Sequence, residues 1–319
     1  MSKTRLSDMI IPENFNAYVS EKTVEKNAFF RSGVLVDNPQ LRELLQMGGK
    51  TIHMPFVKPL SGDSQIPSED GDLSINKIAT SEDLARRQFR AQVFGENQLA
   101  SVLSGDDVMD RIAEGFGDYW NTEYTKILLH TTKGVFASLT DKVHDASSDV
   151  FSVGGAIDAK FLMGDAHDKI GLVAVHSKTY ALMLKQDQIE TVPNSMGTGH
   201  IKIYKPLECE VVVDDAIPYD NSTKVSSMYM YGTGAFGFVE DLTGIVGTEI
   251  YRDALKGLGD NALINRKQFV LHPLGVKWVE PTGERISPTN TELATAANWE
   301  RVKEDKNIAL VEYKFKVEA

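Results

Sequence analysis

Apolar residues recur every three or four positions along residues 106–135, and this spacing is the strongest pattern in the chain. Steps of three and four place side chains on one face of an α-helix. The positions on that face are Val108, Ile112, Phe116, Trp120, Tyr124, Ile127 and Leu128. Acidic residues near the start and basic residues near the end are typical of helix termini. We therefore predict one spine helix of about 30 residues, roughly 45 Å long at ~1.5 Å per residue.

Three glycines fall within this helical pattern. Gly134 follows the last basic residues and is predicted to terminate the helix. Gly115 and Gly117 lie inside it, where each costs about 1 kcal/mol relative to alanine. We expect these two to mark a bend or a place where another backbone comes close.

Residues 51–94 have the pattern of a long two-stranded arm. Residues 51–60 read as extended, residues 61–72 are a polar loop rich in Gly, Ser, Asp and Pro, and residues 87–93 alternate between apolar and polar side chains. A lone hairpin is only marginally stable in water. Two interpretations follow: a surface hairpin packed on its own domain, or an arm that reaches onto a neighbouring copy.

The rest of the chain mixes strands and helices without a repeat, which favours the α+β class. Helices are predicted at 20–30, 39–47, 96–103, 157–163, 179–186 and within 244–258. Strands are predicted at 33–36, 170–176, 201–204, 209–213, 225–231, 269–271, 276–279 and 308–317. Residues 137–155 are predicted to be irregular.

Composition narrows the class of protein. The chain has 319 residues with 34 Lys and Arg against 45 Asp and Glu, a net charge of −11. Proteins that bind nucleic acid by neutralising phosphates are usually basic. The single cysteine excludes an internal disulfide framework. The N-terminus has no apolar signal core and no apolar run could span a bilayer, so we expect a soluble protein made in the cytoplasm, with no membrane association.

One glycine-rich motif, residues 232–237, fits the spacing of a dinucleotide-binding or kinase loop. A dinucleotide site needs a helix directly after the loop, and residues 238–244 do not start one convincingly. The other kinase signatures are absent from the remaining sequence. We therefore prefer a strand and turn in which glycines permit tight packing, and keep a nucleotide-binding enzyme as the alternative.

No other group of residues forms a catalytic or metal-binding pattern. The Asp214-Asp215 pair precedes a proline turn, where aspartates commonly close strands. The seven histidines include no helical i, i+4 pair of the kind that binds zinc. Cys209 lies within a predicted strand, as an inert thiol, and a structural role is favoured for His272. The sequence thus predicts no catalytic residue, no metal site and no cofactor.

Several segments, in the same order, resemble the major capsid proteins of tailed bacteriophages, whose fold is shared with herpesvirus shells and encapsulins. They are a Gly-Asp followed by a hydrophobic–His–Ser strand at 164–177, a strand and proline turn at 211–218, an aromatic-glycine strand at 229–237, and segments 249–253 and 266–275. The arrangement of arm, loop, long helix and α+β domain is also that of the family. The likeness covers about residues 50–280.

The resemblance implies a division of the chain into named parts. These are an N-terminal arm at 1–50, an extended loop at 51–95, a peripheral domain with the spine helix at 96–150, an axial domain at 151–265, and a return to the peripheral domain at 266–319.

The resemblance also implies a structural role without enzymatic turnover. Pentamers and hexamers would form an icosahedral shell that encloses phage DNA without sequence-specific binding, and the mature location would be the virion. Because only about 50 residues precede the extended loop, any scaffolding protein would be separate; a portal and a decoration protein are further possible partners. An encapsulin-like compartment is the alternative role for the same fold.

We expect subunit contacts at Phe30, Phe56, Lys58, Ile66 and Phe89. Some family members link subunits covalently through a lysine on the extended loop. Lys58 is the nearest match in position, but a solvated lysine is the preferred interpretation.

Overall fold

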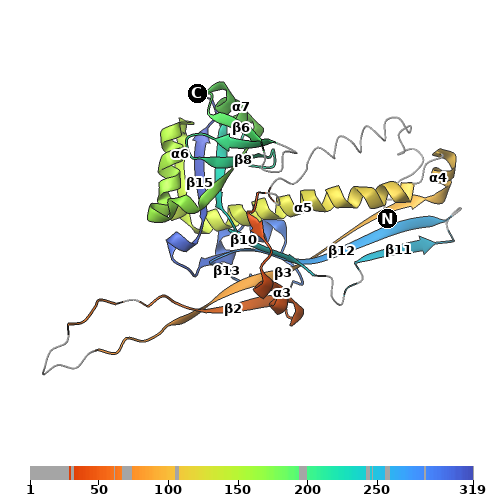
Figure 1. Ribbon diagram of the computed structural model, residues 1–319. Helices are drawn as coiled ribbons and strands as arrows, with labels where there is room; N and C mark the ends of the chain where they lie inside the picture. The colour runs from red at the N-terminus through yellow and green to blue at the C-terminus, as the bar shows by residue number, and fades with distance from the viewer. Residues whose placement is uncertain are drawn as a thin grey trace.

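The α+β class is confirmed: two sheets share one long helix (Figure 1). The computed structural model describes residues 29, 32–60, 62–66, 74–104, 108–193, 200–241, 245, 247–255, 259–283 and 285–318. Its helices are α3 (Pro39–Gln46), α4 (Gln98–Ser104), α5 (Val108–Ser138), α6 (Val153–Lys160), α7 (Ser177–Lys185) and α8 (Asn290–Leu293). The first predicted helix, 20–30, falls almost wholly outside the described residues.

The larger sheet has seven strands and stands above one end of α5 (Figure 1). Its order is β4 (Val143–Val150), β15 (Leu310–Lys316), β9 (Val225–Gly232), β5 (Ile170–Val175), β8 (Cys209–Val213), β7 (His200–Tyr204) and β6 (Ile189–Pro193). Helices α6 and α7 contribute to the apolar core on one face of this sheet, with Ala156, Ala159 and Met183 fully buried.

The six-stranded sheet is long and narrow and lies below α5 (Figure 1). Its order is β1 (Leu35–Val36), β10 (Phe236–Glu240), β12 (Asp260–Pro273), β3 (Thr80–Asn97) and β2 (Thr51–Val57), with β11 (Thr248–Asp253) also beside β12. A small separate pair is formed by β13 (Val276–Trp278) and β14 (Trp299–Arg301). β3 changes partner along its length: residues 80–86 pair with β2, and residues 87–97 pair with β12.

Helix α5 joins the two sheets through its aromatic side chains. Phe136 stacks on Tyr229 of the seven-stranded sheet, with ring centroids 5.6 Å apart. Tyr124 packs edge-on against Phe269 of the six-stranded sheet at 4.9 Å, and its hydroxyl donates to Glu240 at 2.8 Å. Offset and edge-on ring pairs add to the stability that burial of their area supplies. The predicted spine helix is thus confirmed, and both sheets depend on it.

The end of the spine helix was predicted wrongly. Helix α5 continues past Gly134 to Ser138. The reason is tertiary: a Cβ at Gly134 would lie less than 3.0 Å from the carbonyl oxygen of Leu293 and 2.7 Å from the indole nitrogen of Trp299. Gly134 therefore lets the segment around α8 approach the helix. No other backbone comes close to Gly115 or Gly117, because a Cβ at either position would meet nothing within 4 Å in the described chain. The close approach expected at these two glycines is therefore not found.

Two other predictions were wrong. Residues 143–150, expected to be irregular, form β4, which pairs in parallel with β15. The helix expected within 244–258 is instead the edge strand β11, which pairs with β12 over residues 248–253. In both cases hydrogen bonding to a distant strand decided the conformation, and local sequence could not reveal that partner.

Replacing Gly134 with alanine should destabilise the protein by about 1–3 kcal/mol, because the added methyl group overpacks a closed contact. Gly117→Ala is the matched control in the same helix. It should be neutral or stabilise by up to about 1 kcal/mol, since alanine is the better helix former and the site is open. Urea unfolding of the unassembled protein measures both. Equal effects of the two substitutions would contradict the assignment of Gly134 to a packing contact.

Candidate assembly surfaces

The hairpin of β2 and β3 projects away from the body of the molecule (Figure 1). Strand pairing ends at Val57 and Thr80, and one more backbone bond joins Lys58 to Ala79 at 2.9 Å. Beyond it, the described parts of residues 58–79 form no strand, and their side chains are exposed. Large apolar side chains there are among the most exposed in the described chain: Leu60 82%, Ile66 92%, Ile75 95% and Ile78 68%.

Buried hydrogen bonds fix the hairpin where it leaves the body. The Nε2 of His272 donates to Asp83 at 2.9 Å, and the backbone N–H of Gly275 donates to the same carboxylate at 3.0 Å. Burial alone would raise the pKa of Asp83, but attraction to His272 and these hydrogen bonds outweigh it. The pKa of Asp83 consequently lies below its ordinary value of 3.8. The structural role expected for His272 is confirmed.

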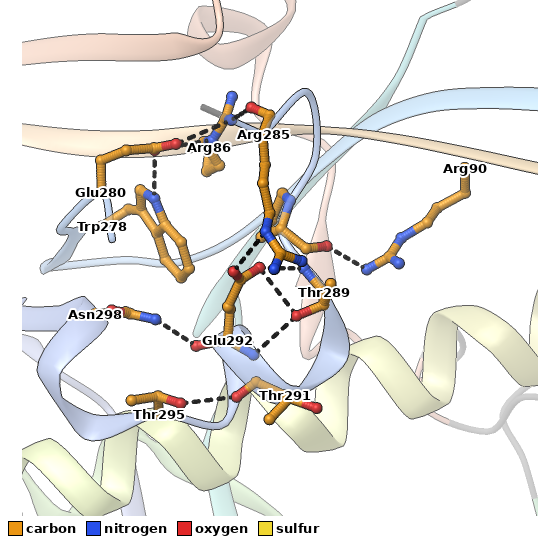
Figure 2. A network of polar contacts seen from close by, with 11 residues as sticks. Arg86, Arg90, Trp278, Glu280, Arg285, Thr289, Thr291, Glu292, Thr295 and Asn298 are labelled. Carbon is orange, nitrogen blue, oxygen red and sulfur yellow. Dashed lines mark hydrogen bonds and ion pairs between the residues drawn. The ribbon is translucent and has the colours of Figure 1, made fainter. Parts of the chain in front are cut away.

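A second polar network fixes the next part of β3 (Figure 2). Arg86 is 3% exposed; it forms an ion pair with Glu280 at 3.0 Å and donates to the carbonyls of Lys50 and Arg285. The guanidinium of Arg285 in turn pairs with Glu292 at 3.1 Å. These contacts tie the root of the hairpin to the segment that ends in α8.

The far end of the same network rests on α8. Glu292 and Thr289 form a reciprocal capping box at its N-terminus. Arg90 of β3 donates to the carbonyl of Pro288 at 2.8 Å and to the side chain of Asn290 at 2.9 Å. Because α8 packs on α5, the direction in which the hairpin leaves is coupled to the spine helix.

A cavity of about 960 Å³ lies at the root of the hairpin. One wall is formed by residues 56–60, 77 and 79 of the hairpin. The others are formed by Asp168 and Lys169 and by residues of the β9–β10, β12–β13 and β14–β15 connections. Phe56 and Leu274 contribute apolar surface, and the ammonium of Lys303 lies 5.6 Å from the centre of the Phe56 ring.

The structure places the predicted interface residues in different regions. Phe56 and Lys58 come together at the root cavity, and Ile66 is near the tip of the hairpin. Phe89 is half-buried within the sheet of the body, where its N–H donates to Ser287 at 3.1 Å. Phe30 lies outside the described residues. The role of all five in subunit contacts stays a prediction.

Sequence reasoning missed a second surface at the opposite end of the six-stranded sheet, which we call the distal cluster. Its members are exposed apolar side chains from β3, α4, β11 and the residues after β11. They are Val93 50%, Leu99 45%, Val102 65%, Leu103 62%, Ile250 67%, Tyr251 56% and Leu255 96%. Strand β11 is also an edge, since only β12 pairs with it in the described chain. Assigning residues 244–258 to a helix concealed this surface.

The glycine-rich motif at 232–237 has a packing explanation. A Cβ at Gly232 would come within 2.9 Å of the carbonyl oxygen of Lys169, and one at Gly237 would collide with Leu41. The motif connects β9 to β10 by a turn, with a strand after it where a dinucleotide site would have a helix. The preferred interpretation, tight packing, is confirmed.

Other candidate chemistry also has structural explanations. Asp214 and Asp215 accept backbone N–H groups of Ala216 and Ser177, as turn residues do. Cys209 is fully buried, and burial raises the pKa of its thiol. Within the described residues there is no group of three or more His, Cys, Asp or Glu side chains that could hold a metal ion, and no helix long and apolar enough to cross a membrane.

Comparison with known proteins gives consistent results. Residues 106–311 match the Gp13-like family, described as major capsid protein 13-like. The major capsid protein of Bacillus phage SPP1 is 37% identical over 329 residues and is matched along the full length of both chains.

Solved structures show the same fold. The capsid of Ralstonia phage GP4 has a TM-score of 0.55 at 8% identity and covers 85% of each chain. The capsid of Helicobacter pylori bacteriophage KHP30 has a TM-score of 0.53 at 10% identity over 92% of each chain. The holo-SrpI encapsulin complex from Synechococcus elongatus has a TM-score of 0.56 at 9% identity, over 93% of this chain and 90% of that one. The fold expected from the resemblance is thereby confirmed.

Asp83→Asn should reduce the free energy of unfolding by about 1–3 kcal/mol at pH 7, because it disrupts the buried hydrogen bonds that Asp83 accepts from His272 and Gly275. The folded-state pKa of Asp83 is depressed, so its contribution is present above pH 3.8 and is lost as pH falls below that value. The difference between wild type and Asp83→Asn should therefore shrink at pH 3 in urea unfolding.

The neighbouring Glu82→Gln substitution is the control for this measurement. Glu82 pairs with His53 at 3.1 Å, but both side chains are more than half exposed. Exposed pairs contribute about 0–1 kcal/mol, so this variant should unfold almost as wild type does. A loss for Asp83→Asn no larger than that for Glu82→Gln would refute the assignment of Asp83 as the residue that fixes the hairpin root.

Proposed function

The chain belongs to the Gp13-like family of major capsid proteins, and we propose which of its surfaces hold neighbouring subunits together. It is the major capsid protein of a tailed phage, many copies of which form the head shell, and it is therefore a component of the virion. The observation that carries the proposal is the projecting hairpin, whose apolar side chains have no cover from the described part of their own chain.

Burial of these side chains on a neighbour would supply the free energy of assembly. Burying an Ile or Leu side chain contributes about 1.5–3 kcal/mol, and four large apolar side chains beyond the paired part of the hairpin are more than two-thirds exposed. A rigid root limits the conformational entropy lost on association, because the hairpin direction is already fixed by Asp83 and Arg86. We infer that the hairpin lies against the next subunit.

The distal cluster supplies a contact of a second kind. It lies at the opposite end of the same sheet, so one subunit can be held at both ends (Figure 1). Contacts between unlike surfaces of identical subunits form rings when the rotation closes. We propose that pentamers and hexamers built this way form the shell. In each subunit the arm, loop, peripheral, axial and return segments would be residues 1–50, 51–95, 96–150, 151–265 and 266–319, respectively.

Other partners follow from the same role. A shell that encloses DNA should not bind it tightly, and the net charge of −11 suits that requirement. A separate scaffolding protein, a portal and a decoration protein are proposed partners. The family relatives are structural proteins, and we propose that this chain likewise performs no catalytic turnover.

An encapsulin-like compartment is the less supported alternative. The encapsulin match rests on fold at 9% identity, whereas the phage SPP1 relative is 37% identical over its full length. One fold can host several functions, so a shared fold alone does not decide the role. The 37% identity to the phage SPP1 protein therefore favours the phage role.

Electron microscopy of the purified protein, alone or co-expressed with a scaffolding protein, should show rings or shells. Replacing residues 59–78 with Asn-Gly should leave a folded chain, because that dipeptide makes a two-residue hairpin turn between Lys58 and Ala79. This shortened protein should form shells with a yield at least about tenfold lower than that of wild type. A loss of ~1.4 kcal/mol of binding free energy per contact produces a tenfold effect.

Two measurements keep this test decisive. Urea unfolding should show that the shortened protein is as stable as wild type before assembly. Leu184→Ser, which removes an exposed apolar side chain of α7 that the proposal does not use, should leave shell yield unchanged. Normal shells from the shortened protein would overturn the proposed role of the hairpin without affecting the family assignment.

A further inference from the structure

The root cavity is basic, although the chain as a whole is acidic. Its charged lining residues are the cations Lys58, Lys77, Lys169, Arg301 and Lys303 and the anions Asp168 and Glu304. The lining therefore carries 5 − 2 = +3, whereas the chain carries −11. A concave surface lined by one sign of charge concentrates ligands of the opposite sign. The charge of the cavity thus favours an anionic ligand.

Three of the five cations form no ion pair in the described part of the chain. Arg301 already has two ion pairs, and the ammonium of Lys169 donates to a backbone carbonyl oxygen at 2.6 Å. The three that remain are Lys58, Lys77 and Lys303. An anionic ligand could therefore contact these lysines without displacing a carboxylate of the described chain from them.

Apolar surface lies beside these lysines. Phe56, Leu60 and Leu274 line the same cavity, and the ammonium of Lys303 lies 5.6 Å from the centre of the Phe56 ring. The volume of about 960 Å³ suits a ligand the size of a few amino-acid side chains, since ligand pockets usually measure ~300–1,000 Å³. A ligand that matches both surfaces carries anionic groups next to an apolar group.

Backbone hydrogen bonds fix the body side of the cavity. The carbonyl oxygen of Gly275 accepts the N–H groups of Val302 and Lys303 at 3.0 and 3.2 Å. The N–H of Gly275 donates to Asp83 at the hairpin root. The backbone at Lys303 is thus held before any ligand binds, which limits the conformational entropy lost on binding.

The hairpin side of the cavity lies where strand pairing ends. Strand β2 ends at Val57 and β3 begins at Thr80, and both lysines of the hairpin wall, Lys58 and Lys77, lie just beyond these ends. A ligand that contacts these lysines and also Lys303 would join the hairpin to the body at this point. Its binding would therefore add contacts that hold the hairpin in one position relative to the body.

We propose that the root cavity is the binding site for an acidic peptide segment of a scaffolding protein. Carboxylates of that segment would lie between the hairpin lysines and Lys303, and an apolar side chain would pack against Phe56 and Leu274. The bound segment would set the position of the hairpin before the hairpin packs on a neighbouring subunit. This inference rests on the proposed function and gives one of the proposed partners its site.

Other partners match the cavity less well. Lysines attract phosphates as well as carboxylates, but Asp168 and Glu304 repel phosphates, and a phosphate backbone has no apolar side chain for Phe56. A partner that joins the finished shell would reach the cavity only after the hairpin had packed on its neighbour. An acidic peptide present during assembly meets both the chemistry and the timing.

Fluorescence anisotropy tests the site in the unassembled, full-length protein. The probe is the fluorescein-labelled peptide Asp-Glu-Phe-Glu-Asp-Leu-Asp-Glu. Wild type should bind it, and affinity should fall at least about tenfold between ~0.05 and ~0.5 M NaCl, because salt screens exposed charges. The same peptide with serine in place of Phe and Leu should bind more weakly, as should a thymidine oligonucleotide of equal length. Tighter binding of the oligonucleotide would overturn the proposal and assign the cavity to phosphate.

Variants of the two walls locate the bound peptide. K58E/K77E, on the hairpin side, should weaken binding at least about tenfold, and K303Q, on the body side, at least about fivefold. K178E/K185E changes two exposed lysines of α7 and should bind as wild type does. Urea unfolding should show equal stability for all of these proteins. An effect of K58E/K77E without one of K303Q would place the peptide on the hairpin alone and overturn the cavity as its site, as would the absence of both effects.

Co-expression with a scaffolding protein connects the site to assembly. The scaffolding protein should copurify with unassembled wild type and at least about fivefold less with K303Q, the same loss as for the peptide. Lys303 belongs to the body wall, so this substitution leaves the hairpin unchanged. Normal shells and normal copurification with K303Q would overturn this inference and leave the proposed function intact. Wild type that forms no shells with the scaffolding protein would instead overturn the proposed function.

Discussion

The structure depends on the packing of α5 against two sheets, with which it shares one apolar core. Its side chains pack against Tyr229 of the seven-stranded sheet and Phe269 of the six-stranded sheet. Thirty-one residues at ~1.5 Å each make a helix of roughly 46 Å, so one rigid element packs against both sheets. An elongated shape follows, and with it more surface than the chain can cover by itself.

Buried polar contacts give that elongated shape a fixed direction. Apolar packing is non-directional, whereas the hydrogen bonds of Asp83 and Arg86 specify one position for the hairpin relative to the body. Paired and hydrogen-bonded charges at such a site are tolerated because their partners satisfy them. The hairpin is thereby presented to neighbours in a defined orientation, which a shell built from many identical contacts requires.

The same fold serves phage capsids and an encapsulin, so the architecture alone does not decide between them. Sequence relationship favours the phage role, since the phage SPP1 protein is 37% identical over its full length. In this chain the hairpin exposes Leu60, Ile66, Ile75 and Ile78, and the distal cluster exposes apolar side chains at the other end of the sheet. These side chains are exposed, where the fold imposes few restrictions on residue type.

The sequence by itself determined the elements whose signal is local. The spacing of aromatic residues in α5, the alternation in β3 and the apolar run of β5 predicted those elements, and the ordered series of segments predicted the family. Tertiary structure alone decided the features that depend on partners distant in the chain. Gly134 lies inside the helix, where its missing side chain makes room for Leu293 and Trp299. Residues 248–253 form a strand because β12 supplies their hydrogen-bond partners. His272 has a structural role because its side chain meets Asp83. The root cavity likewise exists only because the folded chain brings Lys58, Thr233 and Lys303 together, and no pattern of neighbouring residues encodes that encounter.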